Sequence, residues 1–200
     1  MTKTQTSSKS STTGDDFASL PPRERILAAA RTLFYARGIH SVGVDAIAEA
    51  ALTNKMTLYR HFKSKDELIV AYVRLLAAEG DASWDQIATA CPADPQKQIA
   101  GWIAYVEECL ASKMERGCAL ANAAVELPPS HPARGVIDAY KQDKRERLVQ
   151  LFAQAEYPNP NGLADEVFLL FEGANISQQC GGKDLATRVV AMLRELVRPR

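Results

Sequence analysis

The chain has 200 residues, of which 46% are hydrophobic and 24% are charged, and its formal net charge at pH 7 is zero. This composition is typical of a globular protein with enough apolar mass for one or two domains. No run of about eighteen apolar residues is present, so the sequence predicts no contact with a membrane. The first residues also lack an apolar signal-peptide core, and we therefore expect a cytoplasmic protein.

The charge is unevenly distributed along the chain. Residues 1–65 contain ten Lys and Arg against five Asp and Glu, whereas residues 66–200 contain fourteen against nineteen. This asymmetry predicts a basic binding module that is joined to an acidic body with a different role.

The N-terminal segment is predicted to be a disordered tail. Residues 2–13 contain five Thr, four Ser and no apolar residue, so they cannot bury enough surface to offset the entropy of ordering. We expect the tail to cover residues 1–19. The alternative is a tail that contacts DNA phosphates through Lys3 and Lys9.

Three helices are predicted after the tail. Apolar residues recur every three or four positions over residues 23–37, which indicates an amphipathic helix that ends at Gly38. Two short helices are predicted next, over residues 44–51 and 55–62, with a break at residues 52–54.

A capping box marks the start of a long fourth helix. Ser64 and Glu67 have the S-x-x-E spacing that satisfies two backbone donors at a helix N-terminus. Helical periodicity continues to the C-terminus, with breaks at Pro- and Gly-rich segments, and no long segment alternates with period two. The sequence therefore predicts an all-α protein of about nine helices.

The three short helices have the arrangement of a helix-turn-helix DNA-binding unit. In such a unit the second helix of the pair enters the major groove. The helix predicted over residues 55–62 carries cations at Lys55 and Arg60, and Lys63 follows it directly. Leu58 and Phe62 lie four residues apart and are expected to pack this helix against the other two.

The run VDAIAEAALTNKMTLYRHFKSKDELIVAYV resembles the N-terminal domain of the TetR/AcrR family of transcriptional repressors, most densely between Thr57 and Leu68. The resemblance implies a helix-turn-helix domain over residues 20–66 and a helical effector-binding and dimerisation domain over residues 67–200. It also implies a ligand-released repressor that binds a palindromic operator in double-stranded DNA as a homodimer. The resemblance implies the following DNA-contacting residues: Val44, Asp45, Thr53, Asn54, Lys55, Met56, Thr57, Tyr59, Arg60, His61 and Lys65.

Three positions depart from the family pattern. The family has glycine in the turn where this chain has Leu52, which must either adopt a positive φ or change the turn. Gly43 replaces the usual Thr or Ser cap. Asp45 is a carboxylate among phosphate-binding residues, and we expect it to stabilise the N-terminus of its helix.

The resemblance also implies a pocket for an unknown small-molecule effector in the C-terminal domain. Asn122 and Glu126 lie on an otherwise apolar helix and need polar partners, and a carboxylate there favours a cationic or hydrogen-bond-donating ligand. The expected pocket residues are Trp102, Tyr105, Cys118, Asn122, Glu126, Tyr140, Phe171 and Gln178.

The last two helices, predicted over residues 163–180 and 184–197, resemble the pair through which the family dimerises. Their apolar stripes are too rich for an exposed surface, and Gly173, Ala174 and Ser177 allow close approach.

Other functions have weaker support. Four cysteines, at 91, 109, 118 and 180, are expected to be buried thiols rather than a redox sensor or zinc site. The chain has no phosphate-binding loop and no catalytic motif, so neither a cofactor nor an enzyme activity is predicted. The alternative function is a protein of the same fold that acts as a DNA-associated adaptor for a protein partner.

Overall fold

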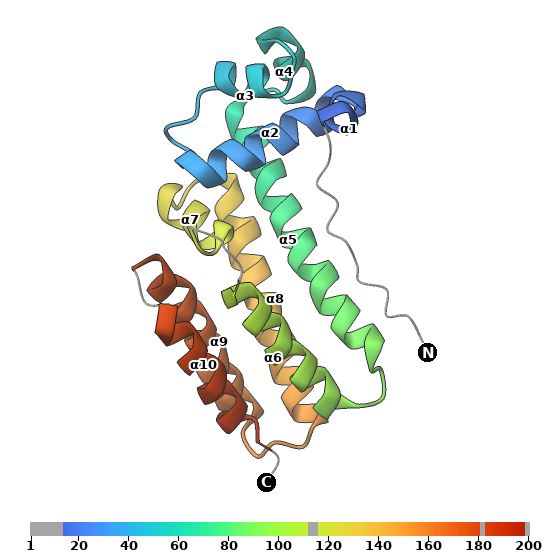
Figure 1. Ribbon diagram of the computed structural model, residues 1–200, viewed down its shortest axis with the longest axis vertical. Coiled ribbons are helices and arrows are strands. Elements are labelled where there is room, and N and C mark those ends of the chain that lie inside the picture. The colour runs from blue at the N-terminus through green and yellow to red at the C-terminus, as the bar shows by residue number, and fades with distance from the viewer. Residues whose placement is uncertain (1–13, 112–115, 181–182, 199–200) are drawn as a thin grey trace. The chain divides into compact units, whose positions relative to one another are not determined.

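The computed structural model describes residues 14–111, 116–180 and 183–198, and this part of the chain consists of ten helices without a strand (Figure 1). The predicted all-α fold is confirmed. The chain divides into two compact units, Met1–Leu68 and Ile69–Arg200, whereas the sequence placed the domain boundary between residues 66 and 67.

The first unit contains four short or medium helices and the beginning of a long one. These helices are α1 (Gly14–Ser19), α2 (Pro22–Arg37), α3 (Val44–Ala50) and α4 (Lys55–His61), followed by α5 (Lys65–Ala90), which continues into the second unit. The second unit contains α6 (Pro95–Ala111), α7 (Ala119–Glu126), α8 (Pro132–Gln154), α9 (Pro160–Gln179) and α10 (Lys183–Leu196).

Helix α1 corrects the predicted extent of the tail. Residues 14–19 were expected to be disordered, but they form a helical turn that Arg25 stabilises by donating to the carbonyl of Ala18, at 2.8 Å. Ser19 donates to the carbonyl of Asp16 within the same helix, at 2.7 Å. The predicted disorder of residues 1–13 lies outside the described residues.

Local capping signals define the ends of the helices in the first unit. Asn54 caps α4 by accepting from the backbone N–H of Thr57, at 2.9 Å. The capping box is confirmed, because Ser64 accepts from the N–H of Glu67 at 3.0 Å, while the Glu67 carboxylate accepts from the N–H of Lys63 at 2.8 Å. The two caps mark where the short α4 and the long α5 begin.

The second unit has its own apolar core between α6, α8, α9 and α10. Trp102, Val106, Phe152, Val167 and Leu193 are buried in one cluster, against which Trp84 and Ile87 of α5 pack. Helices α9 and α10 run side by side (Figure 1). In the described part of the chain, no helix combines the length and apolarity needed to cross a bilayer.

Candidate nucleic-acid interface and ligand cavity

Buried apolar side chains hold α3 and α4 together. Ile47 of α3 and Leu58 of α4 are fully buried, as is Phe62 directly after α4, so the predicted packing of α4 is confirmed. Between the two helices, Leu52 adopts φ 52°, the left-handed conformation that was one of its two expected outcomes. Leu52 is 62% exposed, so little burial offsets the strain of this conformation.

The exposed surface of α4 carries polar, cationic and aromatic groups. Met56 is 84% exposed and Tyr59 is 42% exposed, with Lys55 and Arg60 also on the surface. An exposed short helix with this composition has the donors that reach phosphate oxygens and base edges. Three other predicted contacts, Thr53, Thr57 and His61, are half-buried.

Two of the predicted contact residues form an ion pair. The ammonium of Lys55, the first residue of α4, lies 3.1 Å from a carboxylate oxygen of Asp45 in α3. Asp45 is therefore paired across the turn, in addition to the helix-terminus role that we expected for it. Val44, at the start of α3, is half-buried, and no side chain caps this helix at Gly43.

Lys65 has a structural contact in the first unit. Its ammonium donates to the carbonyl of Ile39 at 2.7 Å and lies 6.0 Å from the ring centroid of Phe34. A phosphate contact by Lys65 must therefore coexist or compete with this hydrogen bond.

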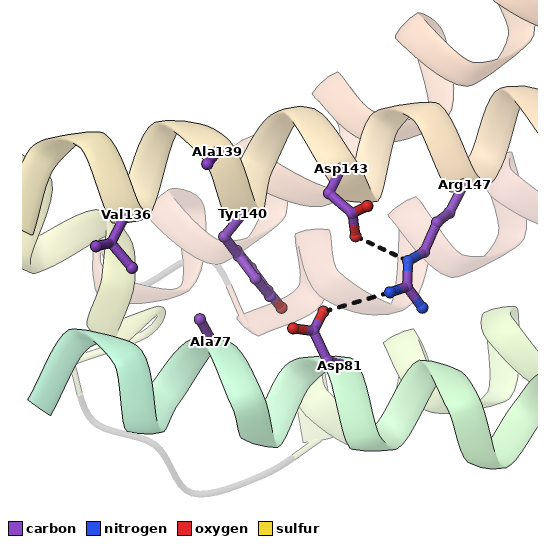
Figure 2. A pocket seen from close by; sticks show the side chains of 7 residues that line it. All are labelled: Ala77, Asp81, Val136, Ala139, Tyr140, Asp143 and Arg147. Carbon is purple, nitrogen blue, oxygen red and sulfur yellow. Dashed lines mark hydrogen bonds and ion pairs between the residues drawn. The ribbon is translucent and has the colours of Figure 1, made fainter. Parts of the chain in front are cut away.

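A cavity of about 310 Å³ lies between α5 and α8 in the second unit (Figure 2). One part of its lining is apolar and contains Ala77, Val136 and Ala139, and the other part is ionic. The ionic part holds Arg147, whose Nε donates to Asp143 of the same helix at 2.8 Å and whose guanidinium lies 3.9 Å from Asp81 of α5.

The ring of Tyr140 extends from α8 toward α5 and forms part of the cavity lining (Figure 2). Its hydroxyl lies so close to Gly80 that a Cβ built on this glycine would be 2.0 Å from the hydroxyl oxygen and 2.8 Å from Cζ. Only glycine at position 80 leaves room for this ring, which explains a glycine in the middle of a long helix.

A partly buried ammonium completes the contact between α5 and α8. The side chain of Lys144 is only 11% exposed and donates to Asp81. Its ammonium also lies 5.0 Å from the ring centroid of Tyr140 and 5.7 Å from that of Trp84. Because a buried charge needs partners, Asp81 is required on α5 for Lys144 to lie here.

Most of the expected pocket residues lie away from this cavity, of whose lining only Tyr140 was predicted. Trp102 is buried in the core and contacts Phe171 edge to face, with 6.1 Å between ring centroids. Asn122 donates to the carbonyl of Arg116 at 2.6 Å, so its polar group stabilises the start of α7. Glu126, at the end of α7, is half-buried, and the side chain of Gln178 lies outside the described residues.

Two tyrosines share an environment inside the second unit. Burial, followed by the nearby thiol of Cys109, raises the pKa of Tyr105 above its usual range. Burial, followed by the charge of Asp81, raises the pKa of Tyr140 above its usual range as well. The expectation that all four cysteines are buried is wrong, because Cys91, Cys109 and Cys118 are half-buried and Cys180, just after α9, is exposed.

Helices α9 and α10 present an apolar surface to solvent. Leu169 is 69% exposed and Ile176 is 50% exposed on α9, and Leu185 and Met192 are 47% and 44% exposed on α10. Each pair is seven residues apart, which places its members on one face of its helix. A Cβ on Gly173 would meet nothing within 4 Å, so the surface of α9 between Leu169 and Ile176 is open.

The arrangement of α2, α3 and α4 agrees with what a family comparison finds. The model of the bacterial regulatory proteins of the tetR family matches residues 26–72. Residues 26–72 therefore match a TetR-family domain. The segment is 45% identical over 53 residues to the HTH-type transcriptional regulator UidR of Escherichia coli K12, a match that covers 26% of this chain and 27% of UidR. It is 44% identical over 52 residues to the HTH-type transcriptional activator FasR of Mycolicibacterium smegmatis, covering 26% of this chain and 24% of FasR.

The match to these curated relatives thus spans about a quarter of their length. Solved TetR-family structures extend the similarity to most of the chain. A TetR-family transcriptional regulator from Streptomyces coelicolor is 28% identical with a TM-score of 0.82, covering 88% of this chain and 94% of that one. The reduced form of NemR from E. coli has a TM-score of 0.73 at 21% identity, covers 88% of this chain and 97% of NemR, and shows a shared fold alone.

Sequence reasoning missed the residues that form the α5–α8 cavity. Asp81, Asp143 and Arg147 are ordinary surface charges by composition, and Gly80 has no turn motif around it. Gly80 itself could have indicated the site. A glycine in the middle of a helix lowers helix stability, so its presence indicates that another group approaches the helix closely there.

Proposed function

We propose that this chain is a sequence-specific, DNA-binding transcriptional regulator of the TetR family that represses by occupying an operator. The observation that carries the proposal is the α3–α4 unit, in which Leu58 is buried while Lys55, Met56 and Tyr59 are exposed. A helix held in this way from one side can insert its other side into a major groove. DNA binding also implies action in the cytoplasm.

The contacts proposed for this unit follow from side-chain chemistry. Lys55 and Arg60 supply cations, and Tyr59 and Thr57 supply hydroxyls that donate to phosphate oxygens. Met56 offers an apolar side chain to thymine methyl groups or sugars. The remaining proposed contacts at the edges of the unit are Val44, Asp45, Thr53, Asn54, His61 and Lys65.

The first experiment is a selection of bound duplexes from a randomised DNA library, followed by fluorescence anisotropy on the selected and on random duplexes at two salt concentrations. We expect binding to the selected duplex at least a thousandfold tighter than to random DNA, and an affinity that falls steeply as salt increases. Equal and weak binding to both duplexes would contradict the proposal and favour the adaptor function.

Tyr59 provides a sharper test of the interface. Tyr59→Phe keeps the ring and removes only the hydroxyl, so operator affinity is expected to fall about fivefold while the thermal midpoint stays unchanged. Unchanged affinity would remove the phosphate contact from the proposal.

We further propose that the protein acts as a homodimer through α9 and α10. The exposed apolar side chains of Leu169, Ile176, Leu185 and Met192 support this, because such a patch on a soluble helix pair is typical of an interaction surface. A dimer presents two α4 helices to successive major grooves, about 34–36 Å apart, and so matches a palindromic operator.

The dimer is tested by light scattering after size-exclusion chromatography. A Leu169→Asp, Ile176→Asp double variant is expected to be monomeric and to lose operator affinity. Val125→Asp is the matched control, because Val125 is 86% exposed but lies on α7, and this variant should remain dimeric. A dimeric double variant would exclude this interface.

The α5–α8 cavity is our proposed effector site. Its volume of about 310 Å³ lies at the lower end for small-ligand pockets, and its lining combines apolar side chains with Tyr140 and Asp81. A ligand that displaces these side chains acts on α5, which is one continuous helix from Lys65 to Ala90. Ligand-dependent release from the operator then follows from different affinities for two positions of α5.

Two variants distinguish this site from the pocket predicted by sequence. A small-molecule library is screened for compounds that release the protein from a labelled operator. Tyr140→Phe is expected to shift the dose–response of the active compounds, whereas Glu126→Gln, which lies on α7 and does not line the cavity, should leave it unchanged. The reverse result would move the effector site to α7.

A further inference from the structure

The Asp45–Lys55 ion pair lies within the proposed DNA-binding face. Asp45 is on α3, Lys55 is the first residue of α4, and their side chains are 75% and 53% exposed. The pair therefore joins the two helices of the unit across its solvent-exposed surface, at the end of α4 that enters a groove first.

Fold stability does not account for this pair. Exposed ion pairs contribute little to stability because water screens them and two long side chains lose entropy. The two helices are already held by Ile47 and Leu58, both fully buried, and the turn between them is closed onto α3 by the hydrogen bond from the N–H of Thr53 to the carbonyl of Ala48 at 2.9 Å. The pair is therefore available for a different role.

The ion pair disfavours contacts with DNA phosphates and favours contacts with bases that present an amino group. Asp45 attracts the ammonium that would otherwise bind a phosphate, and its own charge is repelled by any phosphate nearby. A duplex that offers only its backbone must therefore separate Lys55 from Asp45 and leave the carboxylate without a partner. A carboxylate in the major groove has a good partner only where a base presents an amino group.

Resting on the proposed operator binding, we propose that Asp45 is a specificity-determining residue that disfavours non-cognate DNA. It holds Lys55 back from nonspecific phosphate contacts and accepts from the N4 amino group of a cytosine in the cognate site. Specificity then arises from a penalty on the wrong partner as much as from a contact with the right one.

The geometry matches one base pair in particular. Across the major-groove edge of a G·C pair, guanine O6 and N7 accept from an ammonium, and the adjacent cytosine N4 amino group donates to a carboxylate. Lys55 and Asp45, 3.1 Å apart, present one donor group and one acceptor group side by side. The cognate half-site is therefore expected to contain a G·C pair at the position that the start of α4 contacts.

The test compares the parent protein with Asp45→Asn on a selected operator duplex and on random duplex, by anisotropy over a range of salt concentrations. The variant is expected to bind random DNA several-fold more tightly and to lose about tenfold in the ratio of operator to random affinity. The salt dependence on random DNA should become steeper by about one unit of slope per protomer, because Lys55 is then free to displace a counterion.

Glu49→Gln is the matched control, because Glu49 is an exposed carboxylate one turn further along α3 and the substitution removes the same charge. It should leave the affinity ratio nearly unchanged. Replacing the G·C pair by A·T should weaken the parent about tenfold and affect Asp45→Asn much less. Thermal midpoints measured alongside establish that both variants are folded.

Three outcomes decide the matter. The role of Asp45 is overturned, and the proposed function stays intact, if the parent strongly prefers the operator and Asp45→Asn has the same ratio of operator to random affinity. An equal loss of ratio in Glu49→Gln would also overturn it, since net charge alone would then explain the effect. A parent without operator preference would overturn both.

Discussion

The contact between Gly80 and Tyr140 allows a quantitative test of how α5 and α8 meet. An alanine in an open helical position stabilises by about 1 kcal/mol relative to glycine, because glycine loses more backbone entropy on folding. At position 80 the added Cβ would lie 2.0 Å from the Tyr140 hydroxyl and 2.8 Å from Cζ, and both distances are far shorter than a van der Waals contact. The tyrosine must therefore move.

Moving Tyr140 has a cost that exceeds the helical gain. Overpacking of this kind typically costs about 1–3 kcal/mol, and here it also separates the ring from Lys144, whose ammonium lies 5.0 Å from its centroid. We expect Gly80→Ala to destabilise by up to about 2 kcal/mol, a fall of several degrees in thermal midpoint for a protein of this size.

The sign should reverse when the obstacle is removed. In a Tyr140→Leu background, Gly80→Ala should stabilise by about 1 kcal/mol, as in any open helix. Gly135→Ala in α8 is the matched control, because a Cβ there meets nothing within 4 Å, and it should stabilise in both backgrounds. The assay is urea unfolding of all variants by circular dichroism. Equal effects of Gly80→Ala in the two backgrounds, within about 0.5 kcal/mol, would refute the close contact.

The remaining predictions concern strain, burial of charge and pH. Leu52→Gly should stabilise by about 0.5–1 kcal/mol in thermal unfolding, because glycine relieves the positive φ of an exposed side chain; destabilisation would show that Leu52 has a packing role. Asp81→Asn should cost about 1–3 kcal/mol by removing the nearest carboxylate partner of Lys144 and leaving it Asp143, 4.0 Å away, and the loss should largely vanish in a Lys144→Met background. The pKa values of Tyr105 and Tyr140 are raised above that of an ordinary tyrosine, as in the unfolded chain. The free energy of unfolding linked to this difference is therefore present in full below about pH 10 and is lost as the pH rises above it. In an ultraviolet titration of the folded protein, both should ionise later than ordinary tyrosines, and Tyr140→Phe should remove one late group; six tyrosines ionising together near pH 10 would contradict this.

The sequence predicted those features that depend on a few neighbouring residues. The capping box at Ser64 and Glu67 consists of two local hydrogen bonds whose partners lie within four positions. The burial of Leu58 follows from periodicity. The positive φ of Leu52 was one of the two outcomes that the resemblance implied, because the family has glycine at this position of the turn.

The helix over residues 14–19 was missed for the opposite reason. Its segment contains only Phe17 as a large apolar residue, so periodicity gives no signal. The helix is stabilised instead by Arg25, which donates to the carbonyl of Ala18 from a different helix seven residues away. Such a contact gives a hydrogen-bond donor to a carbonyl at the C-terminus of the helix from a residue outside it. A pattern within the helix segment cannot predict this contact.

The position of the cavity depends on relations that no periodic pattern contains. Asn122 was expected to face a ligand because a polar group on an apolar helix needs a partner, and its partner is the carbonyl of Arg116 on the loop before α7. The cavity instead lies where Tyr140 meets Gly80 and where Lys144 meets Asp81, pairs that are about sixty positions apart in the chain. Their contact is set by the rotation of two long helices about their own axes. A rotation of one residue position, about 100°, would turn these side chains away from each other. The charged pair and the glycine therefore act together with the buried side chains of α8, such as Ile137 and Phe152, in fixing how α5 and α8 face each other.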